Sequence, residues 1–525
     1  MTTAEAILDR MSTDQKIGQI LSTSVGHHSS AQINADDGSR RSADEHRRAL
    51  AADRERVAQE ISRYQLGGVC YFAGRPDGNL PEEVAETTVT LQAAAPVGLL
   101  ISTDQEGGRV ARLRRGFTTF GSAMSMAALD DPTAVREAAA VSGRELRAVG
   151  INHVFAPVAD VNSDPANPVI GTRSFGSDPA RVARNVVAAI AGYRDAAVAS
   201  TAKHFPGHGD TATDSHLGLP VVGRTVHEWR QVDQPAFTAA VDAGVDAVMS
   251  GHLVLRWAAS AADPDVPATY SRRVLTDLLR TEMGFAGMVV SDALEMAGAL
   301  QGRDSATAAV DALLAGVDQL LMPVDLPATV AALQQAVSNG VVPMERLDQA
   351  CLRVLRLKER LGLLNGSAEV DPAAAGRSQE LAMDLAARAV TVIGPPFLAP
   401  SIQRPVAVVG PAPVSSDLAQ GLTRLGRPVL GPDDNVPADA AVFVVSTGLG
   451  QTGELERVRQ LLSAYPDAVL VLAGSPYGVE LVGGHHTALL SYGNTPVHVQ
   501  GLAIAMADPT RPPSGWLPVA LGSGR

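Results

Sequence analysis

The sequence predicts an α/β protein: a (β/α)8 barrel of the TIM type followed by a smaller α/β sandwich domain. Short apolar runs rich in Val, Ile and Leu recur through the first two-thirds of the chain, separated by longer amphipathic stretches. Each run is nearly continuous rather than alternating, which is typical of strands buried on both faces of a parallel sheet. The same strand–helix rhythm restarts after residue 400 with a shorter set of runs. A second, smaller sheet is therefore expected.

The strands of the barrel are predicted from these runs in chain order. A weak first strand is expected at 16–21, and the others at 67–74, 98–104, 153–160, 200–205, 247–254, 287–292 and 318–324. Apolar residues at helical spacing predict helices between them, for example over 178–196 and 271–283. A segment rich in histidine and charged residues, from Gly26 to Arg56, is expected to be an insertion. Eight strands alternating with helices indicate the barrel.

The second domain follows a long helical run at 344–364, which Asn365 and Gly366 are expected to end. A further helix is predicted near 378–390, and the later strands at 405–410, 440–446, 468–474 and 488–493. The Pro-rich segment 508–515 is expected to form a covering loop. We therefore predict a catalytic barrel over 1–368, a linker with a bridging helix over 369–400, and the sandwich domain over 401–525.

Composition excludes several classes of protein. The chain of 525 residues carries 43 Lys and Arg against 56 Asp and Glu, a formal net charge of −13, which argues against nucleic acid or an anionic membrane as partner. The two cysteines, Cys70 and Cys351, form no disulfide framework. We find no signal peptide and no apolar run long enough to span a membrane. The expectation is a soluble cytoplasmic protein, monomer or homodimer, that acts on a small substrate.

Polar side chains gather where four of the predicted barrel strands end, and active sites of such barrels lie at the carboxyl ends of the strands. Structural ion pairs can explain any one of these ends, but four ends that converge make an all-structural account improbable. The residues concerned are Asp104, Glu106, Arg109 and Arg112 after the third strand, Asp160 and then Arg173 after the fourth, Lys203, His204, His208, Asp210, Asp214 and His216 at the fifth, and Asp292 after the seventh.

These residue types suit glycoside chemistry. A carboxylate at a rigid strand end, Asp292, can attack an anomeric carbon and form a covalent glycosyl–enzyme. His216 can protonate the leaving oxygen, because imidazole titrates near neutral pH. Asp214, two residues before it, can hold that ring in one tautomer. Lys203, Arg112 and Arg173 can then donate hydrogen bonds to sugar hydroxyls, and Asp104 can accept them.

The strings TDQEGGRV, VIGTRSF, KHFPGHGDTATDSH and SDALEM together resemble glycoside hydrolase family 3, specifically its bacterial β-N-acetylglucosaminidase branch. The resemblance covers most of residues 1–370, and the later part resembles the sandwich domain of two-domain members. It implies an exo-acting, retaining hydrolase with Asp292 as nucleophile, His216 as acid/base and Asp214 as its dyad partner. It also implies that the terminal sugar is bound by Asp104, Arg112, Arg173, Lys203 and His204. No catalytic residue is assigned to the second domain.

Two motifs point elsewhere, and neither is favoured. GLGQTG at 448–453 is a GxGxxG string between a predicted strand and helix, but no acidic residue ends the next strand, as a dinucleotide site requires. The histidines and aspartates of 204–216 resemble a metal site, but Pro206, Gly207 and Gly209 break the helix that an HExxH site needs. No cofactor and no metal are expected, and His208 is predicted to brace its loop.

Alternatives of function stay open. A histidine acid/base carries no standing negative charge, so phosphate can take the place of water, and a phosphorylase is one alternative. A β-glucosidase of the same family is a second, and a catalytically silent sugar-binding protein is a third. The natural aglycone, chitobiose or a cell-wall muropeptide, has no readable code in the sequence.

Overall fold

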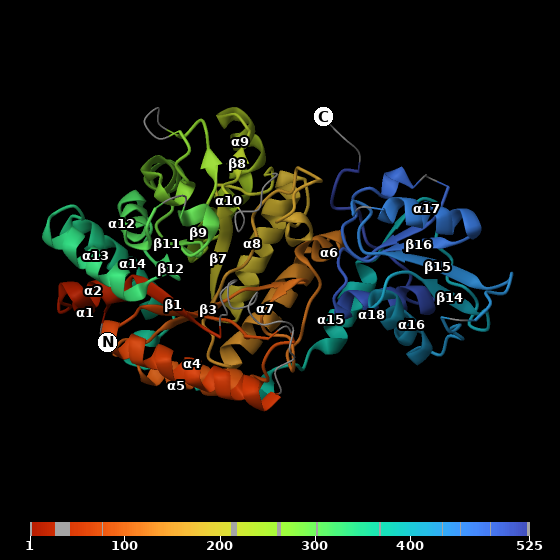
Figure 1. The fold of residues 1–525 in the computed structure, drawn as a ribbon, viewed down its shortest axis with the longest axis horizontal. Coiled ribbons are helices and arrows are strands. Elements are labelled where there is room, and N and C mark those ends of the chain that lie inside the picture. Colours follow the sequence, from red (N-terminus) through yellow and green to blue (C-terminus); the bar gives the residue numbers. More distant parts are fainter. Residues whose placement is uncertain are drawn as a thin grey trace.

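The computed structural model describes residues 3–26, 43–75, 77–211, 218–259, 264–300, 303–366, 369–432, 434–451, 453–482 and 485–521. Figure 1 shows two domains side by side, a barrel surrounded by helices and a second, smaller sheet domain. None of the described helices is both long enough and apolar enough to cross a membrane.

Eight parallel strands form the barrel sheet, in the spatial order β11-β9-β7-β6-β3-β2-β1-β12. A bridge between Val290 and Gln319 brings the two ends of this order together, so the predicted barrel is confirmed. The strands are β1 (Leu21–Val25), β2 (Gly68–Tyr71), β3 (Leu100–Thr103), β6 (His153–Val154), β7 (Ala199–Phe205), β9 (Ala247–Ser250), β11 (Met288–Ser291) and β12 (Leu320–Leu321).

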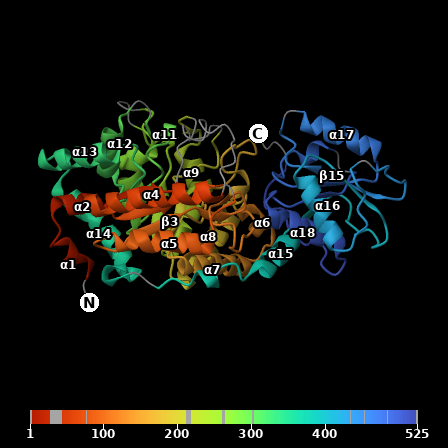
Figure 2. The same cartoon turned by 60° about the horizontal axis from the view of Figure 1, so that its bottom comes forward.

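Helices cover the outside of the barrel, and Figure 2 shows α4 and α5 lying against each other along one side. Two of the longer helices begin with Asp-Pro: Asp131 and Asp178 accept hydrogen bonds from the first free N–H groups, and proline follows at the first helical position. The helices are α1 (Ala4–Leu8), α2 (Thr13–Gln19), α4 (Ala43–Tyr64), α5 (Pro81–Ala93), α6 (Ala123–Ala128), α7 (Pro132–Ala148), α8 (Pro179–Asp195), α9 (Val226–Val232), α10 (Gln234–Asp242), the π-helix η3 (Arg273–Glu282), α11 (Ala297–Leu300), α12 (Ser305–Ala315), α13 (Leu326–Ser338) and α14 (Met344–Arg360).

Short elements lie in the loops of the barrel. They are the hairpin β4 (Gln105–Gly107) and β5 (Val110–Ala111), the pair β8 (Val221–Val222) and β10 (Val254–Leu255), and the 3-10 helices η1 (Gly171–Arg173), η2 (Ala268–Tyr270), η4 (Leu363–Asn365) and η5 (Pro372–Ala374). The hairpin and η1 matter most here, because they carry side chains of the candidate site.

The strand predicted at 16–21 is wrong. Most of that segment belongs to helix α2, and strand β1 begins only at Leu21. The reason is a capping box, in which the Ser12 hydroxyl accepts from the Gln15 N–H and the Gln15 side chain accepts from the Ser12 N–H. The predicted strand at 153–160 is also shorter than expected, since Pro157 has no N–H to donate and pairing resumes only at Val158.

The second domain is a five-stranded sheet between two layers of helices. Its order is β13-β17-β16-β15-β14, with β13 antiparallel to β17 and the other pairs parallel. Phe443 and Val445 of β15 face a core with α16 and α18, and Val442 and Val444 face a core with α17. The elements are α15 (Gln379–Arg388), β13 (Thr391–Ile393), β14 (Val406–Val409), α16 (Val414–Arg424), β15 (Ala441–Ser446), α17 (Glu454–Ala464), β16 (Val469–Leu472), η6 (Val479–Leu481), β17 (Ala488–Leu490) and α18 (Pro496–Ala507).

Strand β13 lies within the segment 369–400 that the sequence predicts as linker and bridging helix. This strand is only three residues long and was not predicted from the sequence. The segment after α18 runs beside it, where the Gly515 N–H donates to the Val390 carbonyl at 3.0 Å. We propose to keep the limits 1–368, 369–400 and 401–525 for the domains, but to count β13 with the second sheet.

The two domains share an interface built on α6. Met124 and Ala128 of this barrel helix are buried in the same apolar cluster as Leu470 and Leu490 of the second sheet. At the start of α6, the Ser122 N–H donates to Nε2 of His498 on α18 at 3.0 Å. Figure 1 shows α6 and α15 between the two domains.

Candidate active site

Side chains from four strand ends meet at one rim of the barrel. Asp104 follows β3, Lys203 and His204 lie near the end of β7, and Asp292 follows β11. Asp160 comes two residues after Val158, which bridges to Lys203. The carboxyl ends of the parallel strands therefore bring together residues that are far apart in the chain.

Five of the charged side chains at this rim form one continuous ion network. Lys203 Nζ lies 2.8 Å from Asp104 Oδ1 and 2.6 Å from Glu106 Oε1. Asp104 Oδ2 also lies 3.2 Å from Arg112 Nη2. Glu106 accepts two hydrogen bonds at 2.8 Å from Nε and Nη2 of Arg173. Lys203 thus joins two carboxylates, each of which holds an arginine.

Burial and charge act in opposite directions on this network, and charge prevails. Burial by itself raises the pKa of Glu106, but Arg173 and Lys203 outweigh it and hold that pKa at about 2. Against the same effect of burial, Lys203 and Arg112 keep the pKa of Asp104 well below its ordinary value. Burial lowers the pKa of Lys203, yet Asp104 and Glu106 raise it overall. Asp104, Glu106 and Lys203 are therefore ionised at neutral pH.

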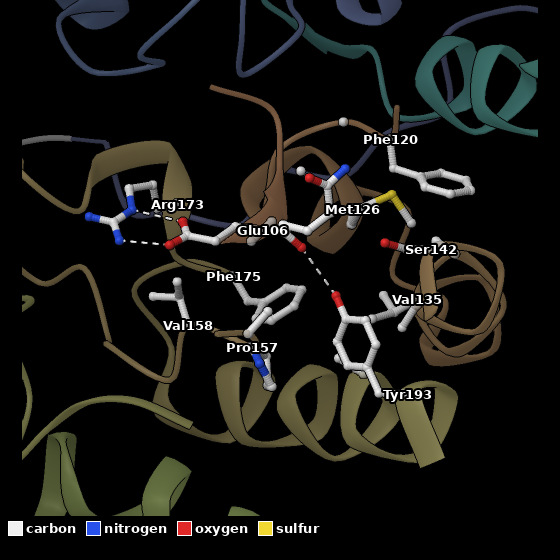
Figure 3. A pocket seen from close by; sticks show the side chains of 18 of the residues that line it. Glu106, Phe120, Met126, Val135, Ser142, Pro157, Val158, Arg173, Phe175 and Tyr193 are labelled. Atoms are coloured by element: carbon white, nitrogen blue, oxygen red, sulfur yellow. Dashed lines mark hydrogen bonds and ion pairs between the residues drawn. The ribbon is translucent and has the colours of Figure 1, made fainter. Parts of the chain in front are cut away.

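The far side of Glu106 borders a small, mostly apolar cavity of about 60 Å³. Figure 3 shows it between the Glu106–Arg173 pair and the side chains of Phe120, Met126 and Phe175. These apolar groups offer no hydrogen bond to the carboxylate. Its charge consequently depends on Arg173 and Lys203, which face it from the rim.

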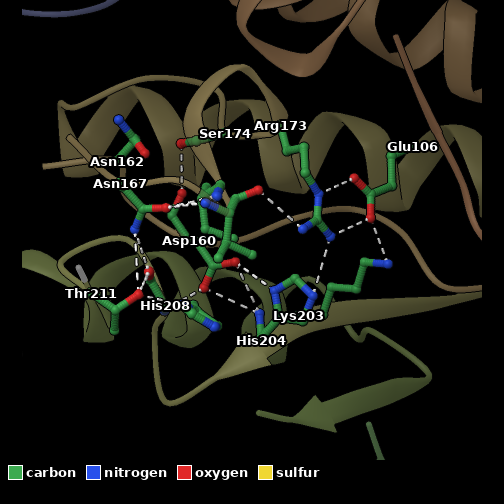
Figure 4. A network of polar contacts seen from close by, with 12 residues as sticks. Glu106, Asp160, Asn162, Asn167, Arg173, Ser174, Lys203, His204, His208 and Thr211 are labelled. Atoms are coloured by element: carbon green, nitrogen blue, oxygen red, sulfur yellow. Dashed lines mark hydrogen bonds and ion pairs between the residues drawn. The ribbon is translucent and has the colours of Figure 1, made fainter. Parts of the chain in front are cut away.

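His204 is held in one orientation by a fully buried carboxylate. Asp160 Oδ2 lies 2.7 Å from His204 Nδ1, and Asp160 Oδ1 accepts from the His208 N–H at 2.7 Å (Figure 4). On the other side of the ring, Arg173 Nη2 lies 3.3 Å from His204 Nε2. Because a guanidinium can only donate, Nε2 must accept, so the neutral ring carries its hydrogen on Nδ1 and donates it to Asp160.

Asp292 is a half-buried carboxylate directly after β11. Its N–H donates to the Ser250 carbonyl at 3.0 Å, and its Oδ1 accepts from the Ala293 N–H at 2.8 Å. Burial raises its pKa, but the basic groups around it (His204, His252 and Lys203) and the Ala293 N–H outweigh this, so the pKa lies below its ordinary value. Asp292 is therefore an ionised group held on rigid backbone.

Comparison with known proteins identifies the family. The model described as "Glycosyl hydrolase family 3 N terminal domain" matches residues 12–357, which is more than half of the chain. The chain belongs to glycosyl hydrolase family 3.

Two similar proteins match different shares of the chain. A beta-N-acetylglucosaminidase/beta-glucosidase of Cellulomonas fimi is 37% identical over 322 residues, covering 59% of this chain and 57% of that protein. A beta-hexosaminidase A of Pseudoalteromonas piscicida is 34% identical over 366 residues, covering 64% of this chain and 61% of that protein. This chain thus spans less than two thirds of the length of both curated relatives.

A solved structure matches nearly the whole chain. The family 3 beta-N-acetylglucosaminidase from Paenibacillus sp. str. FPU-7 has a TM-score of 0.82 and 30% sequence identity. The match covers 97% of this chain and 99% of that one. The two-domain architecture is therefore shared with a family 3 protein from end to end.

Most of the site residues predicted from the sequence lie at this rim of the barrel. Direct contacts join Asp104 to Arg112 and Lys203 and join Arg173 to His204, and Glu106 links Lys203 to Arg173. Asp292 interacts electrostatically with His204 and Lys203. Asp214 and His216, the predicted dyad, lie outside the described residues.

The start of the loop that leads to the dyad is described, and it is firmly anchored. His208 is buried, and its Nδ1 lies 2.5 Å from Thr211 Oγ1. Asn167 donates to the His208 carbonyl at 2.8 Å, as Figure 4 shows. The predicted bracing role of His208 is confirmed. Within the described residues no three His, Cys, Asp or Glu side chains are grouped so as to hold a metal ion.

Sequence reasoning noted Glu106 and Asp160 at strand ends but assigned them no role. Glu106 proves to be the residue that joins Lys203 to Arg173, and Asp160 fixes His204. The position of Glu106 could have indicated its role, because it comes two residues after Asp104 and so lies on the same face of an extended segment. His252, whose Nε2 lies 3.0 Å from the Ala293 carbonyl beside Asp292, had no such signal.

Proposed function

We propose that this protein is an exo-acting, retaining β-N-acetylglucosaminidase that removes terminal N-acetylglucosamine from small oligosaccharides or muropeptides. The observation that carries the proposal is the pairing of an ionised carboxylate after β11, Asp292, with a buried network of fixed charges from β3, β7 and η1. Such a rim offers a nucleophile beside a dense set of hydrogen-bond donors and acceptors. The names of the similar proteins support the same activity.

In the first step, the carboxylate of Asp292 attacks the anomeric carbon. A C–O bond to Asp292 forms as the bond to the leaving oxygen breaks, and His216 gives its proton to that oxygen. In the second step, His216 takes a proton from water, the water oxygen bonds to the same carbon, and Asp292 leaves as a carboxylate. Two displacements at one carbon retain its configuration. Asp214 is proposed to hold the His216 ring and to stabilise its charged form.

The charged network is proposed to bind the terminal sugar. Asp104 would accept hydrogen bonds from hydroxyls, and Lys203, Arg112 and Arg173 would donate them. His204 would present the Nε2 edge of its ring, since its Nδ1 hydrogen is committed to Asp160. The ion pairs hold these side chains in place before substrate arrives, which lowers the entropic cost of binding.

Turnover of 4-nitrophenyl β-N-acetylglucosaminide, with 4-nitrophenyl β-glucoside for comparison, tests the proposal. Both are assayed with and without phosphate, and proton NMR identifies the anomer released first. We expect preference for the N-acetylglucosaminide, the β-anomer first and no response to phosphate. A sugar 1-phosphate product would favour the phosphorylase alternative, faster turnover of the glucoside would favour the β-glucosidase, and absence of turnover would favour a silent sugar-binding protein.

Asp292→Ala tests the nucleophile itself. It is expected to reduce kcat by at least about 10⁴-fold, because no other group at the rim replaces the covalent step. Asp277→Ala, which removes an exposed carboxylate on η3, is the control and should leave kcat unchanged. Near-normal kcat in Asp292→Ala would contradict the assignment of Asp292.

A cytoplasmic location and a role in carbohydrate metabolism are also proposed. The support for the location is that Cys70 and Cys351 are both buried and unpaired, as is usual in a reducing compartment. A monomer or homodimer remains the prediction for the oligomeric state.

A further inference from the structure

The barrel loop that carries Arg173 lies against the second domain. It runs from Asp160 to Ser177 and includes η1, and it contacts the second domain at two separate points. We propose that the second domain positions Arg173 for sugar binding, and that Tyr477 is the positioning residue through which it does so. This inference rests on the proposed function, since it concerns the same sugar-binding arginine.

The first contact passes through the amide of Asn162. Asn162 Nδ2 donates to the hydroxyl of Tyr477 at 2.8 Å, and Asn162 Oδ1 accepts from the Gly171 N–H at 2.9 Å. Gly171 is the first residue of η1, and Arg173 is the last. A single side-chain amide therefore links a tyrosine of the second domain to the short helix that bears Arg173.

The remaining contacts of this amide are weaker. Asn162 Nδ2 also donates to the Asp164 carbonyl, at the longer distance of 3.3 Å. Without the tyrosine hydroxyl, the amide loses its shortest partner on the Nδ2 side and gains freedom to rotate. Rotation would withdraw Oδ1 from the Gly171 N–H, and η1 would then lose its tie to Asn162.

The second contact holds the other end of the loop. The Ser177 N–H donates to the Pro518 carbonyl at 3.2 Å, and the Ala520 N–H donates to the Ser177 hydroxyl at 3.1 Å. Gly176 passes so close that a Cβ added there would lie 2.2 Å from the Pro518 oxygen. The loop is thus fastened on both sides of Arg173, and in the first contact the second domain contributes a side-chain hydroxyl, that of Tyr477, which one substitution removes.

The position of η1 matters because the guanidinium of Arg173 is itself held by hydrogen bonds. Its guanidinium reaches Glu106 and His204, so a shift of η1 pulls against the two hydrogen bonds to Glu106. Bidentate contacts of this kind tolerate little displacement. A loosened η1 therefore weakens sugar binding more than it weakens the chemistry at Asp292.

Tyr477→Phe tests the proposal because it removes the hydroxyl and keeps the ring. The matched control is Tyr492→Phe, which removes another hydroxyl of the second domain, one that donates to Thr391 at 2.7 Å and has no link to the loop. We expect KM for the aryl N-acetylglucosaminide to rise about fivefold in Tyr477→Phe, the order of one lost hydrogen bond, with kcat nearly unchanged. Tyr492→Phe should leave KM unchanged.

Hydrogen exchange of the same variants gives a readout that needs no turnover. Exchange in the segment 168–176 should be faster in Tyr477→Phe, because the Gly171 N–H loses its acceptor, and unchanged in Tyr492→Phe. Unchanged exchange in Tyr477→Phe, or equal effects of both variants, would overturn the positioning role. If the unaltered protein turns over no N-acetylglucosaminide, the proposed function fails, and exchange alone then decides whether Tyr477 orders the loop.

Discussion

Replacing Glu106 by glutamine tests the charge balance at the centre of the site. Glu106 is 3% exposed, accepts two hydrogen bonds at 2.8 Å from Arg173 and lies 2.6 Å from Lys203. Glutamine keeps the size of the side chain but removes its charge. The variant therefore leaves two buried cations, Arg173 and Lys203, with Asp104 as the remaining carboxylate of the network.

The size of the effect follows from the pKa of Glu106, which is about 2 in the folded protein against an ordinary 4.5. A difference of this size corresponds to about 3 kcal/mol in the free energy of unfolding at neutral pH. Since the folded-state pKa is depressed, the contribution is complete above roughly pH 4.5 and declines as the pH falls toward 2. At pH 3 it should have fallen to about 1 kcal/mol.

Urea unfolding at pH 7 and pH 3, followed by tryptophan fluorescence, measures this difference. Trp229 and Trp257 lie in the barrel with ring centres 5.5 Å apart and report on that domain, while Trp516 adds the signal of the second domain. Glu145→Gln is the control, because Glu145 is also buried but accepts its hydrogen bonds from Thr118. The reasoning is refuted if Glu106→Gln destabilises no more than Glu145→Gln at pH 7, or if its effect is the same at both pH values.

Two further predictions concern buried basic groups. His498→Leu leaves the Ser122 N–H without its acceptor and should therefore lower the thermal midpoint at pH 7. Burial lowers the pKa of His498 from 6.5 to about 4, so the stability of the unaltered protein should decrease as the pH falls between these values. Thermal scans across pH 4–7 should show a flatter pH dependence of the midpoint in the variant. Lys358→Met should raise the thermal midpoint more at pH 6 than at pH 10. Burial lowers the pKa of Lys358 from 10.5 to about 7, so the cost of burying the charged ammonium disappears as the pH rises between these values. An equal rise of the midpoint at both pH values would contradict this explanation.

The barrel was predictable because its strands are buried on both faces. Continuous apolar runs located β2, β3, β7 and β11 within a few residues. The same signal failed at 16–21, where a capping box at Ser12 and Gln15 starts a helix in an equally apolar segment. Strand β13 was not predicted because its three residues directly follow helix α15 and show no period of their own.

The site was predictable where a residue follows a strand, and less so where it acts through another residue. Asp104, Lys203 and Asp292 were found from position and chemistry. Asp160 was seen at a strand end, but its bond to His204 depends on how two strands lie in space. Tyr477 lies 315 positions from Asn162 in the chain, and no local pattern connects residues at that distance.

Helix α6 belongs to the barrel by chain order, but it packs into both domains: Met126 and Ala127 lie in the barrel core, and Met124 and Ala128 lie in a cluster of the second sheet. Because Met124 and Ala128 complete an apolar cluster of the second sheet, a truncation near residue 368 would expose them to water, and an isolated second domain would lack part of its core. A chimera that exchanges second domains between relatives must therefore keep the α6 face of Met124 and Ala128 matched to the incoming sheet. A domain boundary chosen from sequence position alone would separate Met124 and Ala128 from the apolar cluster that they complete.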